Sequence, residues 1–520
     1  MTKKLKLSAI IITFIFGCSE KQKVSEFLWG VAISGFQADM GPMSEKDENS
    51  DWWIWTHNEE NIRKGYFKDV PEKSSDFWTH YKQDINIAKS IGVNTFRYGI
   101  EWSRIFPRPT TGVKIKYEYK NDKLIVNIDE EILKELDKIA DQNSIRKYRE
   151  ILSYIRENGL KVFITLNHFS LPVWIHDSIS CRDWFSEIKI EDDINLSEAC
   201  FGKPSGWLSL ESVLEFAKYV AFVARKFGDL ADLWGPINEP IVVATGGYLL
   251  GGISSALGFG AFPPAASNKK AFDIVLKNLI LAHSIAYEMV HLFDRKDADG
   301  DGKSSEVSVI YNISDIYSED KNAQESAWEL LVWRYLDQIL KTDNPKADII
   351  GINYYNRYQV IYAPVLPSVG LFFLPRPCPT SEPSEICPYG ISEMGYEIYP
   401  PGIYNVIKVV SERYKEFGLP ILITENGIAD SKDKIRGWFI KEHLKFVKKA
   451  IDDGIKIIGY FYWSLMDNLE WALGFDKKFG LVEIDFSSPE RKRKIRQSAY
   501  AFSEEIRNWE CKWKNPKNCN

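Results

Sequence analysis

Short apolar runs rich in β-branched and aromatic residues recur along the chain and alternate with longer segments of helical periodicity. The runs predict eight strands, at residues 27–34, 95–98, 162–166, 233–238, 307–311, 349–353, 421–424 and 457–462. Amphipathic segments at residues 81–91, 212–227, 270–293 and 438–453 predict helices between them. This alternation favours a parallel sheet, and eight repeats predict an α/β fold that closes into a single (β/α)8 barrel of the TIM type.

Polar and aromatic side chains gather where the predicted strands end. They are Gln37, Arg97, His168, Asn238 with Glu239, Tyr355, Glu425 with Asn426, and Trp463. Any one of them could be a capping or core residue. In a (β/α)8 barrel, however, the active site is assembled at the carboxyl ends of the strands. We therefore expect one site at this face, surrounded by extended loops.

Composition narrows the class of protein. The 520 residues include 17 Trp, 25 Tyr and 29 Phe, enough for a large core, and no Ser/Pro/Gly-rich linker divides the chain. We assign residues 27–520 to one barrel domain. The net charge of −6, with acidic and basic residues mixed, argues against nucleic-acid binding, because phosphate recognition needs a concentrated basic footprint.

The N-terminal residues have a different pattern. Three lysines within the first six residues precede an apolar run that ends at a glycine directly before Cys18. The run is too short to span a bilayer as a finished helix and is typical of an export signal. We interpret residues 1–17 as a lipoprotein signal peptide, Cys18 as the first mature residue and residues 18–26 as a tether. This predicts an exported, membrane-anchored protein in the periplasm or at the cell surface. Plain secretion and a buried N-terminal segment are the alternatives.

The six other cysteines fall into three local pairs: Cys181 with Cys200, Cys378 with Cys387, and Cys511 with Cys519. An even set in an exported chain favours disulfides, although six cysteines allow 15 connectivities and sequence cannot choose among them. Six reduced thiols are the alternative. The pairs lack the additional His or Cys partners of a structural zinc site.

Two strand-end glutamates could act as a catalytic pair. Glu239 lies in Asn238-Glu239-Pro240 after the fourth predicted strand, and Glu425 lies in Thr424-Glu425-Asn426-Gly427 after the seventh. Hydrolysis of a glycosidic bond with retention needs one carboxylate that attacks the anomeric carbon and one carboxyl that protonates the leaving oxygen. Taken alone, each glutamate could equally be a salt-bridge partner.

Over about residues 27–508 the chain resembles glycoside hydrolase family 1. Six motifs in order carry the resemblance: Phe27-Leu28-Trp29-Gly30, Glu101-Trp102-Ser103-Arg104-Ile105, Asn238-Glu239-Pro240, Asn353-Tyr354-Tyr355, Thr424-Glu425-Asn426-Gly427, and Trp463-Ser464-Leu465 through Glu470-Trp471. Residues 51–78 and 130–140 look closest to the archaeal-type branch of the family.

The resemblance implies an exo-acting, retaining β-glycosidase of the β-glucosidase or β-galactosidase type. It would act on a small-molecule or oligosaccharide β-glycoside without a cofactor. By resemblance, Glu425 is the nucleophile, Glu239 is the acid/base, and Arg97 and Asn353 support them. The implied sugar-binding residues are Gln37, His168, Asn238, Tyr355, Trp463, Glu470 and Trp471. A retaining site places the two carboxyl groups roughly 5 to 5.5 Å apart. The alternatives are a transglycosylase that uses the same site and a catalytically inactive sugar-binding protein.

Three residues depart from the family pattern: Asp39, where Glu is usual; Phe169, where Trp is usual; and Pro236, where Thr or Ser is common. The first two put fine sugar selectivity in doubt. Pro236 is close enough in sequence to alter the setting of Glu239.

An acidic stretch before the fifth predicted strand resembles the opening of a calcium loop. Its carboxylates are Asp297, Asp299 and Asp301. The twelfth position of such a loop would be Ser308, whereas the nearest glutamate, Glu306, is out of register. A solvated acidic turn is therefore the favoured interpretation, with calcium as the alternative.

Two apolar segments follow strands that carry candidate site residues. Residues 241–268 contain no charge, and the predicted loop at 360–379 is also largely apolar. We expect them to line the leaving-group side of the cleft as an apolar entrance, or to lie near lipid. Alternatively, the two segments pack on each other.

Overall fold

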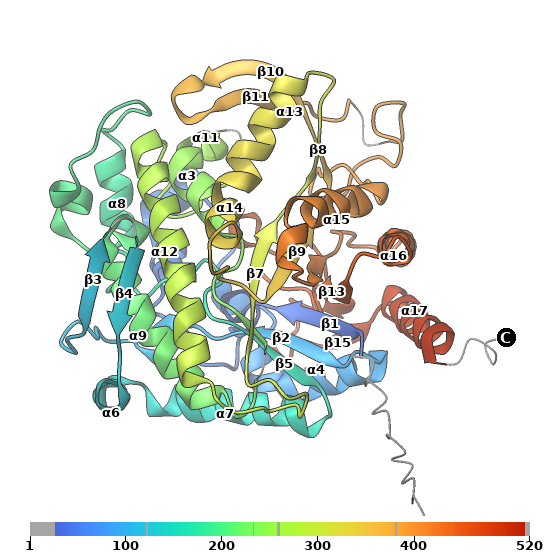
Figure 1. Cartoon of the computed structure of the whole chain (residues 1–520), viewed down its shortest axis with the longest axis horizontal. Coiled ribbons are helices and arrows are strands. Elements are labelled where there is room, and N and C mark those ends of the chain that lie inside the picture. Colours follow the sequence, from blue (N-terminus) through green and yellow to red (C-terminus); the bar gives the residue numbers. More distant parts are fainter. Residues whose placement is uncertain (1–25, 121–122, 232, 257–259, 380–381, 515–520) are drawn as a thin grey trace, which may run out of the picture.

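In a computed structural model, which describes residues 26–120, 123–231, 233–256, 260–379 and 382–514, eight parallel strands close into a barrel (Figure 1). In pairing order they are β1 (Leu28–Ile33), β13 (Ile457–Trp463), β12 (Ile421–Asn426), β9 (Ile349–Tyr354), β7 (Glu306–Asn312), β6 (Leu233–Gly235), β5 (Lys161–Thr165) and β2 (Thr95–Gly99). β2 closes the ring against β1. The predicted (β/α)8 fold and its eight strands are confirmed.

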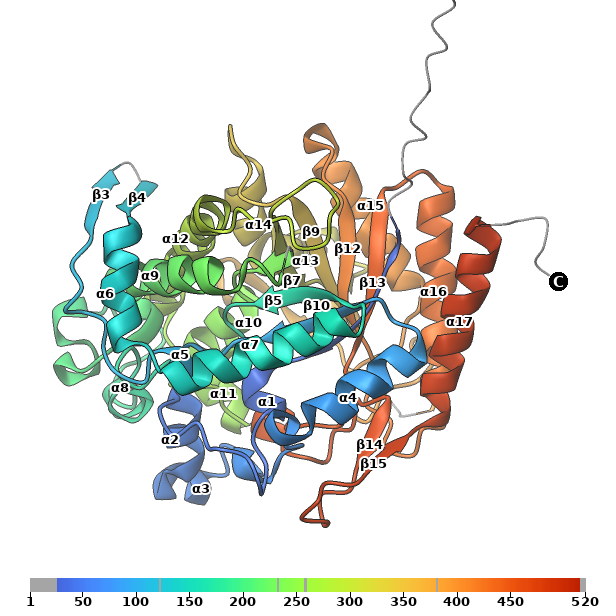
Figure 2. The same cartoon turned by 90° about the horizontal axis from the view of Figure 1, so that it is seen from below.

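Helices cover the outside of the barrel, as the amphipathic segments predicted. The main ones are α4 (Phe77–Ile91), α7 (Gln142–Glu157), α9 (Leu210–Phe227), α12 (Lys269–Phe293), α14 (Arg334–Leu340), α15 (Pro401–Arg413), α16 (Arg436–Asp452) and α17 (Gln497–Lys514). The last helix, α17, packs against α16 and α4 (Figure 2). Two short hairpins lie outside the barrel: β3–β4 (Lys116–Lys120 and Lys123–Asn127) and β14–β15 (Val482–Ile484 and Arg493–Ile495).

Two apolar layers hold the barrel together. The larger layer packs outward-facing strand residues such as Trp29, Val31 and Phe96 against the helices. A separate cluster fills the barrel interior; its buried members are Leu28, Phe163, Leu233, Ile310, Ile349, Leu422 and Phe461. Because alternate strand residues point to opposite faces, every barrel strand except β2 contributes to both layers. The interior cluster fills the barrel with packed side chains, so side chains at the carboxyl ends of the strands rest on a rigid base.

The fourth barrel strand is shorter than predicted. We expected residues 233–238, but β6 ends at Gly235. Pro236 explains the early end, because proline has no N–H to donate to a neighbouring strand. The chain regains contact at Asn238, which forms an isolated bridge with Ile310, and the Glu239 N–H donates to the Ile310 carbonyl oxygen at 3.0 Å. Glu239 is thus held by β7 and not by its own strand.

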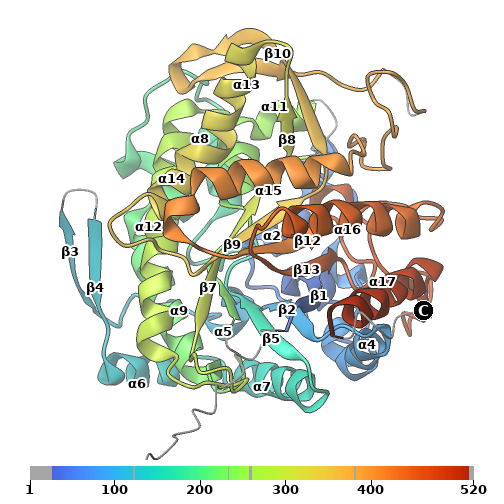
Figure 3. The same cartoon turned by 45° about the vertical axis from the view of Figure 1, so that its right-hand side comes forward.

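The two apolar segments contain regular structure. Residues 241–268 lie largely in α10 (Pro240–Val243), η4 (Ala244–Leu249) and α11 (Gly251–Ala256). The expectation of a loop at 360–379 was wrong: β10 (Arg357–Leu366) and β11 (Leu371–Pro375) form a hairpin. β10 also pairs with β8 (Asp315–Tyr317), and the hairpin packs beside α13 (Lys321–Trp328), as Figure 3 shows. The hairpin is consistent with its β-branched and aromatic composition and with Gly370, which turns the chain at φ 84°.

Two of the three local cysteine pairs are disulfides. Cys181 is bonded to Cys200, and Cys378 to Cys387. The third predicted pair, Cys511 with Cys519, lies outside the residues whose side chains are described, as do the signal peptide, Cys18 and nearly all of the tether. Within the described part of the chain, none of the helices is both long and apolar enough to cross a membrane.

Candidate active site

A cavity of about 850 Å³ opens at the carboxyl ends of the barrel strands. It brings together the two glutamates and all seven predicted sugar-binding residues: Glu239, Glu425, Gln37, His168, Asn238, Tyr355, Trp463, Glu470 and Trp471. Each of them lies in a barrel strand or in the segment that follows one, and every barrel strand except β2 and β7 is represented. The predicted convergence at one face is therefore confirmed. Arg97 on β2 and Asn353 on β9 hydrogen-bond to these residues without being part of the lining.

The hydrogen-bond partners of Glu425 are those that stabilise a carboxylate. The Arg97 guanidinium donates to its Oε1 at 2.6 Å, and the Tyr355 hydroxyl donates to its Oε2 at 2.6 Å. Burial raises the pKa of Glu425, and Arg97 and Tyr355 act against that rise. The pKa of Tyr355 is itself raised, first by burial and then by Glu425, so its hydroxyl keeps the proton that it donates. One oxygen is thus anchored by a cation and the other is oriented by a phenol.

Glu239 has a different environment. Its Oε1 accepts from the side-chain amides of Asn353 at 2.7 Å and Asn312 at 3.1 Å. Among the described residues, no lysine or arginine forms an ion pair with Glu239. Burial, followed by the nearby charge of Glu425, raises the pKa of Glu239 to about 7. A carboxyl group in this setting keeps a proton near neutral pH, which a general acid requires.

Arg97 ties the two glutamates to one framework. Besides Glu425, its guanidinium donates to Asn238 Oδ1 at 2.7 Å and to Thr165 Oγ1 at 2.8 Å. It lies 5.7 Å above the ring of Phe163, which belongs to the interior apolar cluster. The polar network therefore rests directly on a packed floor, which restricts movement of its side chains.

Asn353 forms the second link. It donates to Glu239 and Asn238 and accepts from the Thr424 hydroxyl at 2.6 Å. In the sheet register Asn353 lies opposite both Glu425 on β12 and Asn312 on β7. The pairing of three neighbouring strands thus determines where both glutamates point.

Two predicted sugar-binding residues present polar groups to the cavity. The Gln37 amide donates to the Leu469 carbonyl oxygen at 2.7 Å, whereas its buried Oε1 has no hydrogen-bond partner among the described residues. His168 Nε2 lies 3.1 Å from Asn238 Nδ2. Burial and then Arg97 hold the pKa of His168 well below its usual value, so the imidazole is neutral. Both residues can exchange hydrogen bonds with hydroxyl groups.

Aromatic rings and a third carboxyl complete the predicted sugar-binding set. Trp463 and Trp471 both stack with His168, at centroid distances of 5.5 and 5.9 Å. Burial, then Glu425 and Glu239, raise the pKa of Glu470 to about 8. A protonated Glu470 can donate as well as accept a hydrogen bond. Flat apolar faces beside such polar groups match the two kinds of surface on a pyranose ring.

Besides Pro236, two residues depart from the family pattern, Asp39 and Phe169, and only one of them lines the cavity. Asp39 is fully buried and does not line the cavity; its side chain accepts from the Tyr98 hydroxyl at 2.8 Å. Phe169 does line the cavity, and it has a positive φ of 75°. Asp39 therefore does not face a ligand in the cavity, whereas Phe169 is in place to affect which sugars fit.

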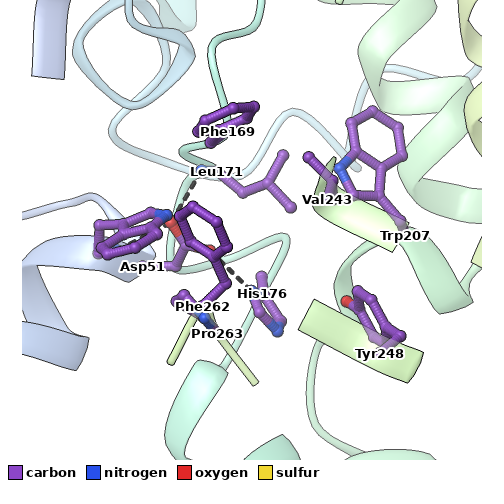
Figure 4. A pocket seen from close by; sticks show the side chains of 10 residues that line it. Asp51, Phe169, Leu171, His176, Trp207, Val243, Tyr248, Phe262 and Pro263 are labelled. Atoms are coloured by element: carbon purple, nitrogen blue, oxygen red, sulfur yellow. Dashed lines mark hydrogen bonds and ion pairs between the residues drawn. The ribbon is translucent and has the colours of Figure 1, made fainter. Parts of the chain in front are cut away.

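A second, much smaller cavity of about 20 Å³ lies behind Phe169 (Figure 4). Asp51 links two other residues that line this cavity: it accepts from the Leu171 N–H at 2.9 Å and pairs with His176 at 2.7 Å. A volume of this size fits about one water molecule and excludes a sugar ring. The large cavity is therefore the one that can hold a glycoside.

Sequence reasoning missed Asn312, which lines the cavity and contacts Glu239. The signal was available: Asn312 directly follows the fifth predicted strand, where a polar residue ends an apolar run. The six family motifs given above do not include it.

The acidic turn is preformed. Asp297, Asp299 and Asp301 can place one oxygen each within 4.8 Å of one another. The N–H groups of Gly300 and Gly302 donate to the Asp297 carboxylate, and Asp299 pairs with Lys161. These contacts give Asp297 and Asp299 partners within the protein; the solvated turn stays a prediction, with calcium as its alternative.

Comparison with known proteins agrees with the geometry. The β-galactosidases of Pyrococcus woesei and Sulfolobus acidocaldarius are 39% and 34% identical to this chain, covering 90% and 88% of it and 93% and 90% of the relatives. The solved β-glycosidase of Thermosphaera aggregans superposes with a TM-score of 0.79 at 33% identity, covering 92% of this chain and 95% of that one. The profile described as Glycosyl hydrolase family 1 matches residues 19–123, 195–353 and 338–511. The chain belongs to glycosyl hydrolase family 1.

Proposed function

We propose that this family member hydrolyses terminal, non-reducing β-D-glycosides with retention, and that Glu425 is its nucleophile and Glu239 its acid/base. The sugars that fit the proposal best are glucose and galactose, because relatives that are 39% and 34% identical to this chain are named β-galactosidases and another is named a β-glucosidase. The substrate would be a small-molecule or oligosaccharide β-glycoside, and no cofactor takes part in the chemistry.

One observation carries the assignment of roles: two buried carboxyl groups share a cavity but have opposite partners. Glu425 is bonded to a guanidinium and a phenol, which favour an anion. Glu239 is bonded to two neutral amides, and its pKa is raised to about 7. Two carboxyl groups with diverging protonation states are the signature of an acid and a nucleophile.

The proposed reaction has two displacement steps. In the first, a Glu425 oxygen attacks the anomeric carbon, the bond to the aglycone oxygen breaks, and the Glu239 proton moves to that oxygen. This releases an alcohol and leaves a glycosyl ester on Glu425. In the second, Glu239 takes a proton from water, whose oxygen attacks the anomeric carbon and displaces Glu425. Both carboxyl groups then regain their starting protonation states.

The sugar would lie between the aromatic rings and the polar groups of the cavity. We propose that Gln37, His168, Asn238 and Glu470 bind its hydroxyl groups and that Trp463 and Trp471 contact its apolar faces. These side chains come from different strands and loops, so they constrain the ring from several directions. Such constraint places the anomeric carbon against Glu425 and contributes to catalysis by orientation.

Two substitutions test the roles. Glu425→Gln should abolish turnover of every β-glycoside, whereas Glu239→Gln should slow poor leaving groups by roughly 100-fold or more and spare good ones, because a general acid typically contributes 10²–10⁴. Glu215→Gln is a matched control. It alters a buried carboxyl group that pairs with Lys218 outside the cavity and should leave kcat unchanged. Wild-type rates for Glu425→Gln would overturn the assignment, and an inverted first-formed anomer by NMR would reject retention.

We also propose export and lipid anchoring through Cys18. The basic and apolar N-terminal pattern supports it, and so do the disulfides Cys181–Cys200 and Cys378–Cys387, because disulfides persist in oxidising compartments. In the native host the wild-type chain should fractionate with membranes and incorporate labelled fatty acid, and Cys18→Ser should do neither. Unchanged membrane association of Cys18→Ser would contradict the proposal.

A further inference from the structure

Glu101 belongs to one of the six family motifs, yet it has no part in the proposed reaction. It follows β2, is only 2% exposed and does not line the cavity. In the barrel β2 lies between β1 and β5. Glu101 is thus a buried carboxyl group between two strands whose following segments supply sugar-binding residues. We call residues 34–39 the β1 segment and residues 166–171 the β5 segment.

The two carboxyl oxygens of Glu101 bind these two segments. Oε1 accepts from the Phe36 N–H of the β1 segment at 2.9 Å, and Oε2 accepts from the Ser170 hydroxyl of the β5 segment. Phe36 directly precedes Gln37, and Ser170 is two residues after His168. Glu101 therefore bridges the two segments beside the side chains proposed to bind sugar hydroxyl groups.

The bridge begins at a fixed point and includes a close contact. The backbone N–H of Glu101 donates to the hydroxyl of Tyr148 on α7 at 3.0 Å. On the other side of the bridge, a Cβ added to Gly35 would lie 2.8 Å from Glu101 Oε1, closer than real Cβ atoms come to another heavy atom. Glycine at this position thus lets the β1 segment approach the carboxyl group.

These two hydrogen bonds offset the burial of the carboxyl group. Among the described residues, no lysine or arginine forms an ion pair with Glu101. Burial raises the pKa of Glu101 to about 7, and the hydrogen bonds from Ser170 and Phe36 act against that rise. A protonated Glu101 could donate to the Ser170 oxygen and still accept from the Phe36 N–H, so both protonation states can keep the bridge.

The two segments also meet through their aromatic rings. The ring of Phe36 stacks on Trp471 at a centroid distance of 6.0 Å, and that of Phe169 lies 4.9 Å from Trp471. Trp471 lines the cavity. A shift of one segment against the other would therefore displace Trp471 as well as Gln37 or His168.

We propose that Glu101 is a positioning residue that holds Gln37 and His168 at the separation and orientation needed to bind one sugar ring. The proposal rests on the hydrolytic function given above and adds a residue that acts through others without touching the substrate. Without the bridge, the β1 and β5 segments should move independently. A displacement of about 1 Å away from the reacting atoms can lower a rate about 100-fold.

Three variants grade the loss of the bridge, with kcat/KM measured on whichever of p-nitrophenyl β-glucoside and β-galactoside the wild type cleaves faster. Glu101→Ala removes both acceptors and should lower kcat/KM about 10- to 100-fold. Glu101→Gln keeps an acceptor for the Phe36 N–H and places a donor beside the Ser170 oxygen, so it should lose about fivefold or less. Ser170→Ala breaks one half of the bridge and should give an intermediate loss.

Double-mutant cycles separate positioning from a general effect on the fold. In a Gln37→Ala or His168→Ala background one of the positioned side chains is already gone, so Glu101→Ala should cost at least about threefold less than in the wild type. In a Tyr355→Phe background the full cost should remain, within about twofold. Tyr355 is the matched control because it contacts Glu425 and not the two partners of Glu101.

The outcomes separate this proposal from the proposed function. A wild-type kcat/KM in Glu101→Ala, or an equal cost of that substitution in every background, would overturn the positioning role and leave the glycosidase assignment intact. If Glu101→Ala does not fold, Ser170→Ala takes its place in the cycle with His168→Ala, and additive costs there would overturn the proposal. A wild-type protein that cleaves neither p-nitrophenyl glycoside would instead contradict the proposed function.

Discussion

Replacing Asn312 with leucine removes one of the two amide donors that contact Glu239 and leaves both carboxyl groups in place. The Asn312 amide donates to Glu239 Oε1 at 3.1 Å, and this bond acts to lower the pKa of Glu239. An amide donor stabilises the carboxylate more than the carboxylic acid. Its loss should therefore favour the protonated form and raise the pKa.

The size of the shift follows from the strengths of the two hydrogen bonds. A bond to a charged group contributes about 1.5–3 kcal/mol, and a neutral one about 0.5–1.5 kcal/mol. The difference of roughly 1 kcal/mol or slightly more corresponds to about one pKa unit, since one unit equals about 1.4 kcal/mol. With Glu239 starting at about 7, Asn312→Leu should move its pKa to about 8.

The assay is the pH dependence of kcat/KM for an aryl β-glucoside with a poor leaving group. Because Glu239 must be protonated to act as an acid, the basic limb of this profile reports its pKa in the free enzyme. We expect the limb to move upward by about one unit. Asn356→Ala is the control, since Asn356 lines the same cavity but donates to the Arg357 carbonyl oxygen. A basic limb that stays in place or moves to lower pH in Asn312→Leu would refute the reasoning.

Three further predictions follow from other contacts. Tyr355→Phe removes a 2.6 Å hydrogen bond to Glu425. Since a hydrogen bond to a charged group contributes about 1.5–3 kcal/mol, kcat should fall about 10- to 100-fold. An unchanged kcat in steady-state assays would contradict a role for Tyr355 in orienting Glu425. Arg493→Met leaves Asp84 buried without its ion pair. Denaturant titrations should therefore show a free energy of unfolding that is about 3–5 kcal/mol lower than that of the wild type. A loss below about 1 kcal/mol would contradict this prediction. Excess calcium, compared with chelator, should not change Tm if the acidic turn at Asp297 is only solvated, whereas a rise in Tm would establish a calcium site.

The sequence by itself determined the order of the eight strands and the strand ends at which the catalytic candidates lie. The reason is that a buried strand and an amphipathic helix each leave a local periodicity, and the barrel places all carboxyl ends of the strands at one face. Glu239 and Glu425 could thus be assigned to one site although 185 residues separate them in the chain. The departure at Pro236 was also visible, and it coincides with the early end of β6.

Only the tertiary structure decided which partner each glutamate has. Asn312, Asn353 and Arg97 come from three strands, and their contacts depend on strand register and side-chain direction, which local sequence does not encode. In the proposed function, these contacts make Glu425 the anion and Glu239 the proton donor. The hairpin at 357–375 likewise needed the fold, because its pairing with β8 and its packing on α13 join segments that are distant in sequence. The identity of the two candidate glutamates could be inferred from sequence. The hydrogen-bond partners that distinguish them required the structure, because those partners lie on neighbouring strands.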